Sequence, residues 1–372
     1  MTASFMEGNE AIARGALAAG CRFFAGYPIT PATTIFQSML SLLPPAGGIC
    51  LQGEDEIASL GFCLGASMAG LKAMTATSGP GISLYSEQIS FAIGSEIPVV
   101  IVDVQRLGPS TGSATRGADG DIQFLRWGNS GGLPVIVLAP VNTADCFVLT
   151  MAAFNLAETY RCPVFVASNK EIGMTRESVD LQTLPRPEIR ERRRFAGPPP
   201  YLPFAADDHD VPDFLPIGDD IVVRQTSSTH GPDGYITTDP ARIASGQQRL
   251  ERKLRSAVDT FSYWEFFGPP DADTLVITYG VSARAARSAV EGCRAAGTGA
   301  ALLVLKTLWP VPVALIREKA AAARRIVVVE MNLGQYVREI RRVLGEPRID
   351  FVGQMDGRLI HPETIEEVIC HG

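Results

Sequence analysis

The sequence has few residues of the kinds that build metal or iron–sulfur sites. Its 372 residues include seven cysteines and four histidines, and the closest two cysteines, Cys50 and Cys63, are 13 residues apart. Zinc and iron–sulfur sites use closely spaced ligands, so we expect no metal site in this chain. An odd number of widely spaced cysteines predicts reduced thiols and no disulfide framework. Any electron carrier that this chain works with is therefore expected on another protein.

The sequence also lacks a long apolar run and an excess of positive charge. No stretch approaches the roughly 18–20 apolar residues that cross a bilayer. Glu7, Glu10 and Arg14 interrupt residues 1–20, which predicts that this segment is not a secretory signal. The net charge of −7 argues against nucleic acid and anionic membranes as main partners. We expect a soluble, cytoplasmic protein.

Hydrophobic residues make up 46% of the chain, which is enough for two compact α/β domains. Apolar runs without strict alternation indicate strands buried on both faces, as in a parallel sheet covered by helices. Residues 1–180 are expected to form one doubly wound domain. Its predicted strands span 22–25, 73–77, 99–104, 135–138 and 164–167, and its predicted helices span 10–19, 31–43, 56–69, 84–93 and 143–158.

Residues 181–239 are predicted to be an extended connector, because eight prolines lie between 185 and 216. We interpret the basic run at 190–194 as a solvated face and not as a binding patch. An amphipathic stretch at 240–261 returns the chain to the globule, and residues 240–372 are expected to form a smaller α/β domain. Its predicted strands span 274–278, 301–305 and 326–330, and its predicted helices span 282–296, 313–322 and 334–344.

Candidate site residues lie in turns that follow predicted strands. In an open α/β sheet, ligands bind beyond the carboxyl ends of the strands. Thr30 is predicted to be the N-cap of a helix with Pro31 at its first position. The alternative role is in binding, since the N–H groups of a first helical turn would receive an anionic substrate. The two interpretations are compatible.

Glu56 stands at the start of a predicted helix that is rich in small residues. Acidic residues at a helix start are favoured by about 0.3–1 kcal/mol, which is a purely structural explanation. Each glycine inside a helix costs about 1 kcal/mol relative to alanine. Residues such as Gly61 and Gly65 therefore indicate that another backbone or a flat ligand approaches this helix closely. A carboxylate at its edge suits a group that shares a proton with a heterocyclic nitrogen.

Arg106 directly follows the predicted strand at 99–104. A lone arginine at such a position is commonly a surface or salt-bridge residue. The functional alternative is a guanidinium fork that binds a carboxylate through two hydrogen bonds. Ser78 and Gly79 follow the strand at 73–77 and allow close approach of the backbone. The segment 117–121 is interpreted as a turn.

Together these segments resemble the α subunits of the 2-oxoacid:ferredoxin (acceptor) oxidoreductases, most closely the 2-oxoglutarate type. The likeness covers both α/β domains in order, and the connector at roughly 195–235 is not matched. The segments that resemble the family are GYPITP at 26–31, GEDEIA at 53–58, MTATSGPG at 74–81, QRLGPSTG at 105–112, TLWP at 307–310 and VEMN at 329–332.

The resemblance implies a thiamine-diphosphate pyrimidine-binding domain followed by a transketolase C-terminal-like domain. Glu56 matches the family glutamate that hydrogen-bonds a ring nitrogen of the thiamine aminopyrimidine. The implied cofactor-binding surface also includes Pro28, Ile29, Ser78 and Gly79.

Three further residues are implied to bind the substrate. Thr30 and Arg106 match positions that hold the carboxylate and carbonyl end of the 2-oxoacid, and with Glu56 they form the expected catalytic group. Arg116 occupies a position where relatives often have a lysine. It is the candidate cation for the second carboxylate of 2-oxoglutarate.

The implied reaction is oxidative decarboxylation of a 2-oxoacid, with 2-oxoglutarate as the best candidate, to acyl-CoA and carbon dioxide. Coenzyme A is the cosubstrate, and electrons pass through iron–sulfur clusters to ferredoxin. The chain lacks the Gly-Asp-Gly loop that holds Mg²⁺ and diphosphate in thiamine enzymes. A β-type subunit is therefore expected to supply the diphosphate and Mg²⁺ site and a [4Fe-4S] cluster. A γ-type subunit is also expected, and a ferredoxin-like δ subunit is a further candidate.

Two other functions remain open from the sequence. The β subunit of a lipoamide-linked 2-oxoacid dehydrogenase has the same order of domains, but the segments 27–31 and 307–310 favour the ferredoxin-linked family. A non-catalytic assembly subunit is the second alternative. The presence of Thr30, Glu56 and Arg106 argues against it.

Overall fold

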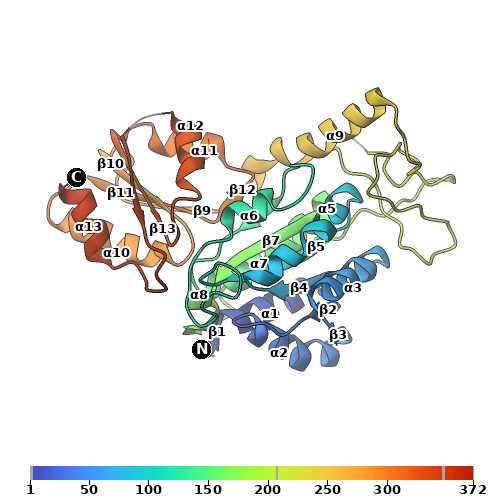
Figure 1. Cartoon of the computed structure of the whole chain (residues 1–372), viewed down its shortest axis with the longest axis horizontal. Helices are drawn as coiled ribbons and strands as arrows, with labels where there is room; N and C mark the ends of the chain where they lie inside the picture. Colours follow the sequence, from blue (N-terminus) through green and yellow to red (C-terminus); the bar gives the residue numbers. More distant parts are fainter. Residues whose placement is uncertain (1–2, 207, 346–347, 372) are drawn as a thin grey trace.

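The computed structural model describes residues 3–206, 208–345 and 348–371. These residues form two α/β units, coloured blue to green and orange to red in Figure 1, which lie side by side. Among them, no helix combines the length and the apolar character that crossing a membrane requires.

The first unit is built on a seven-stranded sheet with the order β12-β6-β7-β5-β4-β2-β3. All neighbours are parallel except β12, which pairs antiparallel with β6. The central strands β4, β5 and β7 are buried along their whole length, as expected for a parallel sheet between helices. The strands are β2 (Phe23–Gly26), β3 (Ile49–Gln52), β4 (Ala73–Thr77), β5 (Val99–Gln105), β6 (Ile136–Leu138), β7 (Pro163–Asn169) and β12 (Thr307–Trp309).

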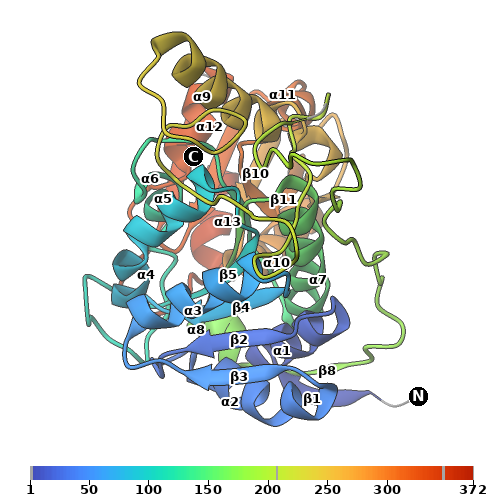
Figure 2. The ribbon, with the colours of Figure 1, turned by 90° about the vertical axis from the view of Figure 1, so that its right-hand side faces the viewer.

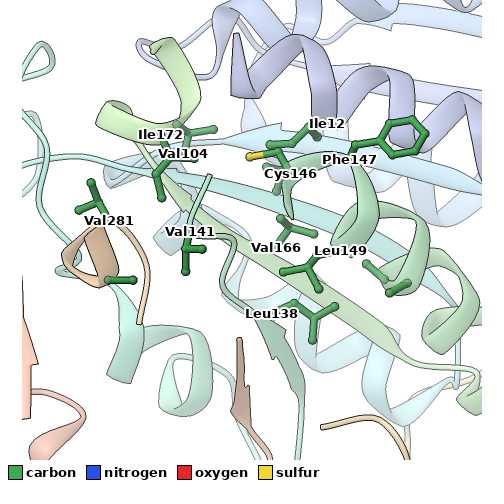
Figure 3. Close-up of a cluster of buried hydrophobic side chains, with 14 of the residues drawn as sticks. Ile12, Val104, Leu138, Val141, Cys146, Phe147, Leu149, Val166, Ile172 and Val281 are labelled. Atoms are coloured by element: carbon green, nitrogen blue, oxygen red, sulfur yellow. The ribbon is translucent and has the colours of Figure 1, made fainter. Parts of the chain in front are cut away.

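Helices cover both faces of this sheet. Ile12 and Phe147, from α1 and α7, belong to a buried cluster with Val104 and Val166 of the sheet (Figure 3). Residues of α3, α5 and α6 pack in the cluster on the opposite face. The helices are α1 (Gly8–Ala18), α2 (Thr33–Leu42), α3 (Glu56–Met68), α4 (Pro80–Leu84), α5 (Ser86–Gly94), α6 (Ile122–Trp127), α7 (Thr143–Tyr160) and α8 (Lys170–Met174), with a short 3₁₀ helix η1 (Pro44–Ala46).

The second unit has a five-stranded sheet with the order β14-β13-β10-β11-β9, parallel except for β9. α10 and α13 cover one face, and α11 and α12 cover the other. The elements are β9 (Trp264–Phe267), β10 (Thr274–Thr278), α10 (Ser282–Ala295), β11 (Ala300–Leu305), α11 (Val313–Ala320), β13 (Arg325–Glu330), α12 (Val337–Leu344), β14 (Arg348–Gly353) and α13 (Pro362–His371).

Several contacts join the units, and two of them involve β12 and α6. β12 follows β11 in the chain but completes the edge of the first sheet, where Thr307 pairs with Leu138. The side chain of Gln123, at the start of α6, donates to the carbonyl oxygen of Gln335 at 2.8 Å. α6 and β12 lie at the junction of the two units in Figure 1.

The connector leaves the first unit after β8 (Arg176–Val179), which pairs antiparallel with β1 (Ser4–Glu7). It ends at α9 (Pro240–Arg255), which is followed by the 3₁₀ helix η2 (Val258–Thr260). Lys253 of α9 donates to Oε2 of Glu96 at 2.8 Å, and Arg249 is hydrogen-bonded to both oxygens of the same buried carboxylate. These ion pairs fix α9 against the end of α5.

One interpretation of the connector is wrong in part. Arg192, in the run expected to be solvated, is buried and forms two hydrogen bonds with Glu158 of α7, at 2.6 and 3.0 Å. It also donates to the carbonyl oxygens of Ser67 and Leu71. The prolines and the charge of this segment predict that its side chains are exposed. The Arg192 guanidinium is buried instead, because the first unit supplies acceptors for it, and these hydrogen bonds attach the connector to that unit.

The predicted elements mostly match the observed ones, and the corrections are local. The helix expected at 84–93 is α5, which begins at Ser86, and Leu84 ends the preceding short helix α4. The amphipathic stretch at 240–261 is α-helical as far as Arg255. Six short strands were not predicted, namely β1, β3, β8, β9, β12 and β14.

Candidate active site

The candidate site lies at the carboxyl ends of β2, β3, β4 and β5, which are neighbours in the sheet (Figure 2). The chain runs outward from β2 to β3 and then crosses back to place β4 on the other side of β2. Such a change of direction leaves a crevice between diverging loops, where ligands of open α/β sheets bind. The turns after β2 and β4 flank this point, and Arg106 follows β5.

Glu56 begins α3 and is 7% exposed. Asp55 is the N-cap, and its side chain accepts a hydrogen bond from the Ala58 N–H at 2.7 Å. Because Asp55 satisfies the cap, the Glu56 carboxylate is left for another role. It lies against Gly81 in α4, where an added Cβ would stand 2.9 Å from Glu56 Oε1. A glycine is therefore needed for α4 to pass so close to this carboxylate.

Ser78 and Gly79 form the turn between β4 and α4. Ser78 is fully buried, and its Oγ has no hydrogen-bond partner among the described residues. Gly79 has a φ of 47°, in the left-handed region that favours glycine. An added Cβ at Gly79 would stand 3.3 Å from the Arg106 side chain. The turn thus brings the Ser78 hydroxyl, which has no partner among the described residues, close to Arg106, the candidate substrate-binding residue.

Arg106 and Thr30 are brought together by the fold. Arg106 is 6% exposed, and its Nη1 donates to the carbonyl oxygen of Thr30 at 2.6 Å. Its Nε has no hydrogen-bond partner among the described residues. Burial lowers the pKa of Arg106, and the acidic groups of Asp121 and Glu56 act in the opposite direction. A buried guanidinium with a free donor suits a planar anion.

The prediction that Thr30 caps a helix is wrong. α2 begins at Thr33 with Ala32 as its N-cap, and the Thr30–Pro31 peptide bond is cis. Thr30 is exposed, so its side chain is available at the turn after β2. Pro28 is also exposed, whereas Ile29 is half-buried and packs against the core.

Arg116 is exposed and lies on the loop that follows Arg106. The loop closes on itself, because the Leu107 N–H donates to the Arg116 carbonyl oxygen at 2.8 Å. The Arg116 side chain lies against Gly357 in the turn after β14, where an added Cβ would stand 2.8 Å from its Cβ. The structure therefore places Arg116 on the loop that begins at Arg106, where this loop meets the second unit.

Two buried acidic residues, Asp103 and Asp119, and the half-buried Asp121 lie near this site, and the sequence does not predict them as site residues. Burial raises the pKa of Asp119 to about 7 and that of Asp121 to about 6. Burial and the neighbouring Asp121 raise the pKa of Asp103 well above its usual range. Asp103 sits in the apolar run of β5, and the sequence predicts only a turn at 117–121. A charged residue inside an otherwise apolar strand was the available signal.

No group of three or more metal-ligating side chains occurs in the part of the chain that the structure describes. Cys293 and Cys370 meet in the second unit, with their sulfur atoms 2.7 Å apart.

Comparison with known proteins identifies the family of the chain. Residues 14–245 match the model of the thiamine-diphosphate-binding domain of pyruvate flavodoxin/ferredoxin oxidoreductases, and residues 272–365 match core domain II of pyruvate:ferredoxin oxidoreductase. The chain is 42% identical to the 2-oxoglutarate synthase subunit KorA of Methanothermobacter marburgensis, over 97% of this chain and 96% of that protein. It is 35% identical to the ketoisovalerate oxidoreductase subunit VorB of Methanothermobacter thermautotrophicus, over 99% and 97%.

Solved structures show the same fold. A 2-oxoglutarate:ferredoxin oxidoreductase from Magnetococcus marinus, solved with 2-oxoglutarate, coenzyme A and succinyl-CoA, superimposes with a TM-score of 0.94 at 33% identity. The match covers 99% of this chain and 64% of that one. A split-gene transketolase, at 13% identity and a TM-score of 0.57, shares the fold alone. The predicted fold class and the resemblance are thus confirmed, and the chain belongs to the thiamine-diphosphate-binding pyruvate flavodoxin/ferredoxin oxidoreductase family.

Proposed function

We propose that the chain is the α subunit of a thiamine-diphosphate-dependent 2-oxoacid:ferredoxin oxidoreductase that uses 2-oxoglutarate. The reaction is oxidative decarboxylation to succinyl-CoA and carbon dioxide, with coenzyme A as cosubstrate and ferredoxin as acceptor. The names of the KorA relatives and the ligands of the Magnetococcus structure support this choice of substrate. We assign residues 1–180 to the pyrimidine-binding domain, 181–239 to the connector and 240–372 to the transketolase C-terminal-like domain.

The observation on which the proposal depends is the position of Glu56. Its buried carboxylate, held between α3 and Gly81, fits a group that must exchange a proton with a ring nitrogen. In thiamine enzymes the cofactor supplies carbanion stabilisation, and the protein supplies placement and electrostatics. Glu56 would hold the aminopyrimidine, with Ser78 Oγ and the backbone of Gly79 beside it. Pro28 and Ile29 would complete the surface from the turn after β2.

Substrate binding is assigned to Arg106, Thr30 and Arg116. Arg106 has a donor left over after its hydrogen bond to Thr30, which suits the 1-carboxylate of a 2-oxoacid. The exposed Thr30 hydroxyl is positioned by the same turn and is assigned to the carbonyl end. Arg116 is assigned to the second carboxylate, because it is exposed on the loop that begins at Arg106.

A partner chain is expected on the exposed face of α3. Among the described residues, an added Cβ at Gly65 would meet nothing within 4 Å, and one at Gly61 would meet a single flexible atom, Nε2 of Gln88, at 3.3 Å. Packing within the described part of this chain therefore does not require a glycine at either position. Ile57 and Phe62 are about half exposed on the same helix. A small-residue surface flanked by exposed apolar side chains suits close docking of another protein.

We assign that face to a β-type subunit that supplies the diphosphate and Mg²⁺ site and a [4Fe-4S] cluster. A γ-type subunit and a ferredoxin-like δ subunit are proposed as further components.

The test is a matched pair of substitutions in the assembled complex. Glu56→Gln keeps the size of the side chain but removes its ability to accept and return a proton. We expect turnover of 2-oxoglutarate to fall by about 10²–10⁴-fold. Glu54→Gln, two residues away and exposed, is the control and should leave turnover within about twofold. Full activity of the Glu56→Gln complex would refute the assignment.

A further inference from the structure

The loop of residues 106–121, here called the substrate loop, joins β5 to α6. Three of its own hydrogen bonds close it, from Leu107 N to Arg116 O, from Ser113 N to Leu107 O and from Arg116 N to Ser113 O, at 2.8–3.0 Å. These bonds tie the arm that begins with Arg106 to the arm that ends with Asp121. These bonds therefore fix the position of one arm relative to the other.

The second arm of the substrate loop is anchored by the second unit. The Asp119 N–H donates to the Met331 carbonyl oxygen at 2.9 Å. Nδ2 of Asn332 donates to the Asp119 carbonyl oxygen at 2.8 Å, and Nε2 of Gln335 donates to the carbonyl oxygen of Gly120. Three consecutive hydrogen bonds thus connect the loop to the turn between β13 and α12.

Asn332 and Gln335 are themselves rigidly held. Asn332 is fully buried, and its Oδ1 accepts from the N–H groups of Gly334 and Gln335, both at 2.9 Å. Its Nδ2 also donates to the Tyr279 hydroxyl at 2.8 Å. Oε1 of Gln335 accepts from the Gln123 N–H at 2.9 Å. Both side chains are therefore held in one orientation, and none of these hydrogen bonds involves Arg106.

We infer that Asn332 and Gln335 are positioning residues for the 2-oxoacid site, acting through the substrate loop that they clamp. The inference rests on the proposed function and adds a role for the second unit in substrate binding. The clamp determines where the two arms stand, and so where the Arg106 and Arg116 side chains can meet a dicarboxylate. A misplacement of about 1 Å in a binding group can cost about a hundredfold in rate.

The experiment uses Gln335, which is only half-buried, so that its variants are expected to fold. Gln335→Glu keeps an acceptor for the Gln123 N–H but cannot donate to Gly120. Gln335→Met removes both side-chain hydrogen bonds at similar volume. The control is Thr278→Val, which removes a buried hydrogen bond of the second unit, to Val329 O at 2.9 Å, that does not reach the loop.

In the assembled enzyme, we expect both Gln335 variants to raise the KM for 2-oxoglutarate about tenfold, with kcat within about threefold. The KM for coenzyme A should not change. Hydrogen exchange of the peptide that contains Asp119 should become about tenfold faster, because its N–H is held by the clamp. Thr278→Val should leave both the KM and this exchange rate as in the unsubstituted enzyme.

Two outcomes separate the inference from the proposed function. If the unsubstituted complex turns over 2-oxoglutarate but the Gln335 variants change neither KM nor exchange, the inference fails and the function stands. It also fails if Thr278→Val raises the KM equally, since that would indicate general loosening. A complex with full cofactor that decarboxylates no 2-oxoacid overturns the proposed function, whatever the exchange data show.

Discussion

The Arg106 guanidinium donates to the backbone of Thr30, not to its side chain, across the carboxyl ends of two strands. Nη1 stands 2.6 Å from the Thr30 carbonyl oxygen, and the Thr30–Pro31 peptide bond is cis. The turn after β2 and the start of the substrate loop are thereby linked by one planar cation. This arrangement leaves the Thr30 hydroxyl and the remaining guanidinium donors for a ligand.

Arg106→Lys should weaken 2-oxoacid binding, although it keeps the charge. An ammonium group is a point donor and cannot serve the Thr30 carbonyl and a carboxylate with the fork geometry of a guanidinium. We expect the KM for 2-oxoglutarate to rise by about 10–100-fold in the assembled enzyme, measured by steady-state kinetics. A KM unchanged by Arg106→Lys would mean that Arg106 serves the fold alone.

Arg116→Ala should discriminate between substrates. If Arg116 binds the second carboxylate, its loss affects only 2-oxoacids that have one. We expect the KM for 2-oxoglutarate to rise about tenfold or more, with little change for a monocarboxylic 2-oxoacid. Arg358→Ala, an exposed arginine of the turn that Arg116 touches, is the matched control. Equal effects of Arg116→Ala on both substrates would remove Arg116 from the site.

Glu96→Gln should destabilise the chain by about 3–5 kcal/mol, because it leaves Lys253 and Arg249 facing a buried neutral group. The free energy of unfolding in urea is the measurement. Glu251→Gln, which removes a surface ion pair with Arg255, should cost less than about 1 kcal/mol. A similar loss of unfolding free energy for both variants would show that the buried ion pairs of Glu96 stabilise the chain no more than a surface pair does.

The same carboxylate predicts a pH dependence. Burial acts to raise the pKa of Glu96, but Lys253 and Arg249 outweigh it and hold the pKa at about 2, below its ordinary value of 4.5. A group with a depressed pKa in the folded state stabilises the fold above its unfolded pKa. The stability difference between the unsubstituted chain and Glu96→Gln should therefore shrink as the pH falls from about 5 towards 2. A constant difference would contradict this.

Cys293 and Cys370 should form a disulfide under mild oxidation, although the sequence predicted scattered thiols. Their sulfur atoms are 2.7 Å apart, and Cys370 is exposed. Glutathione disulfide would accept the two electrons and two protons and leave as two glutathione thiols. We expect a mass lower by two hydrogen atoms and about 3–4 kcal/mol of added stability, since the bond would close a long loop. Cys370→Ser should abolish both changes; formation of the bridge without any stabilisation would contradict the loop-closure argument.

The interior strands were predictable from sequence because they are apolar on both faces. β4 and β10 occupy the residues expected, Ala73–Thr77 and Thr274–Thr278. The short edge strand β3 is exposed and lacks such a run, so local pattern could not identify it. β12, of three residues, is defined by a partner about 170 positions earlier in the chain, which no local signal reveals.

The site was predictable to the extent that its residues follow buried strands. Glu56, Ser78, Gly79 and Arg106 all lie at one edge of the sheet, as the topology of parallel strands requires. The sequence predicts the N-cap of α2 at Thr30, two residues too early, because Pro31 is compatible with a turn before the helix as well as with its first position. The sequence does not predict a site role for Asp119 and Asp121. Their environment depends on contacts between this glycine-rich segment and the second unit, which the local sequence does not reveal.

The edge strand β12 has a practical consequence for producing the protein. A fragment that stops before residue 306 would uncover the backbone groups of β6 (Ile136–Leu138), and a bare sheet edge invites intermolecular pairing and precipitation. Cutting the gene inside the connector and expressing both pieces together should instead allow the two fragments to associate, because the C-terminal fragment contains β12, which pairs with the exposed edge of β6.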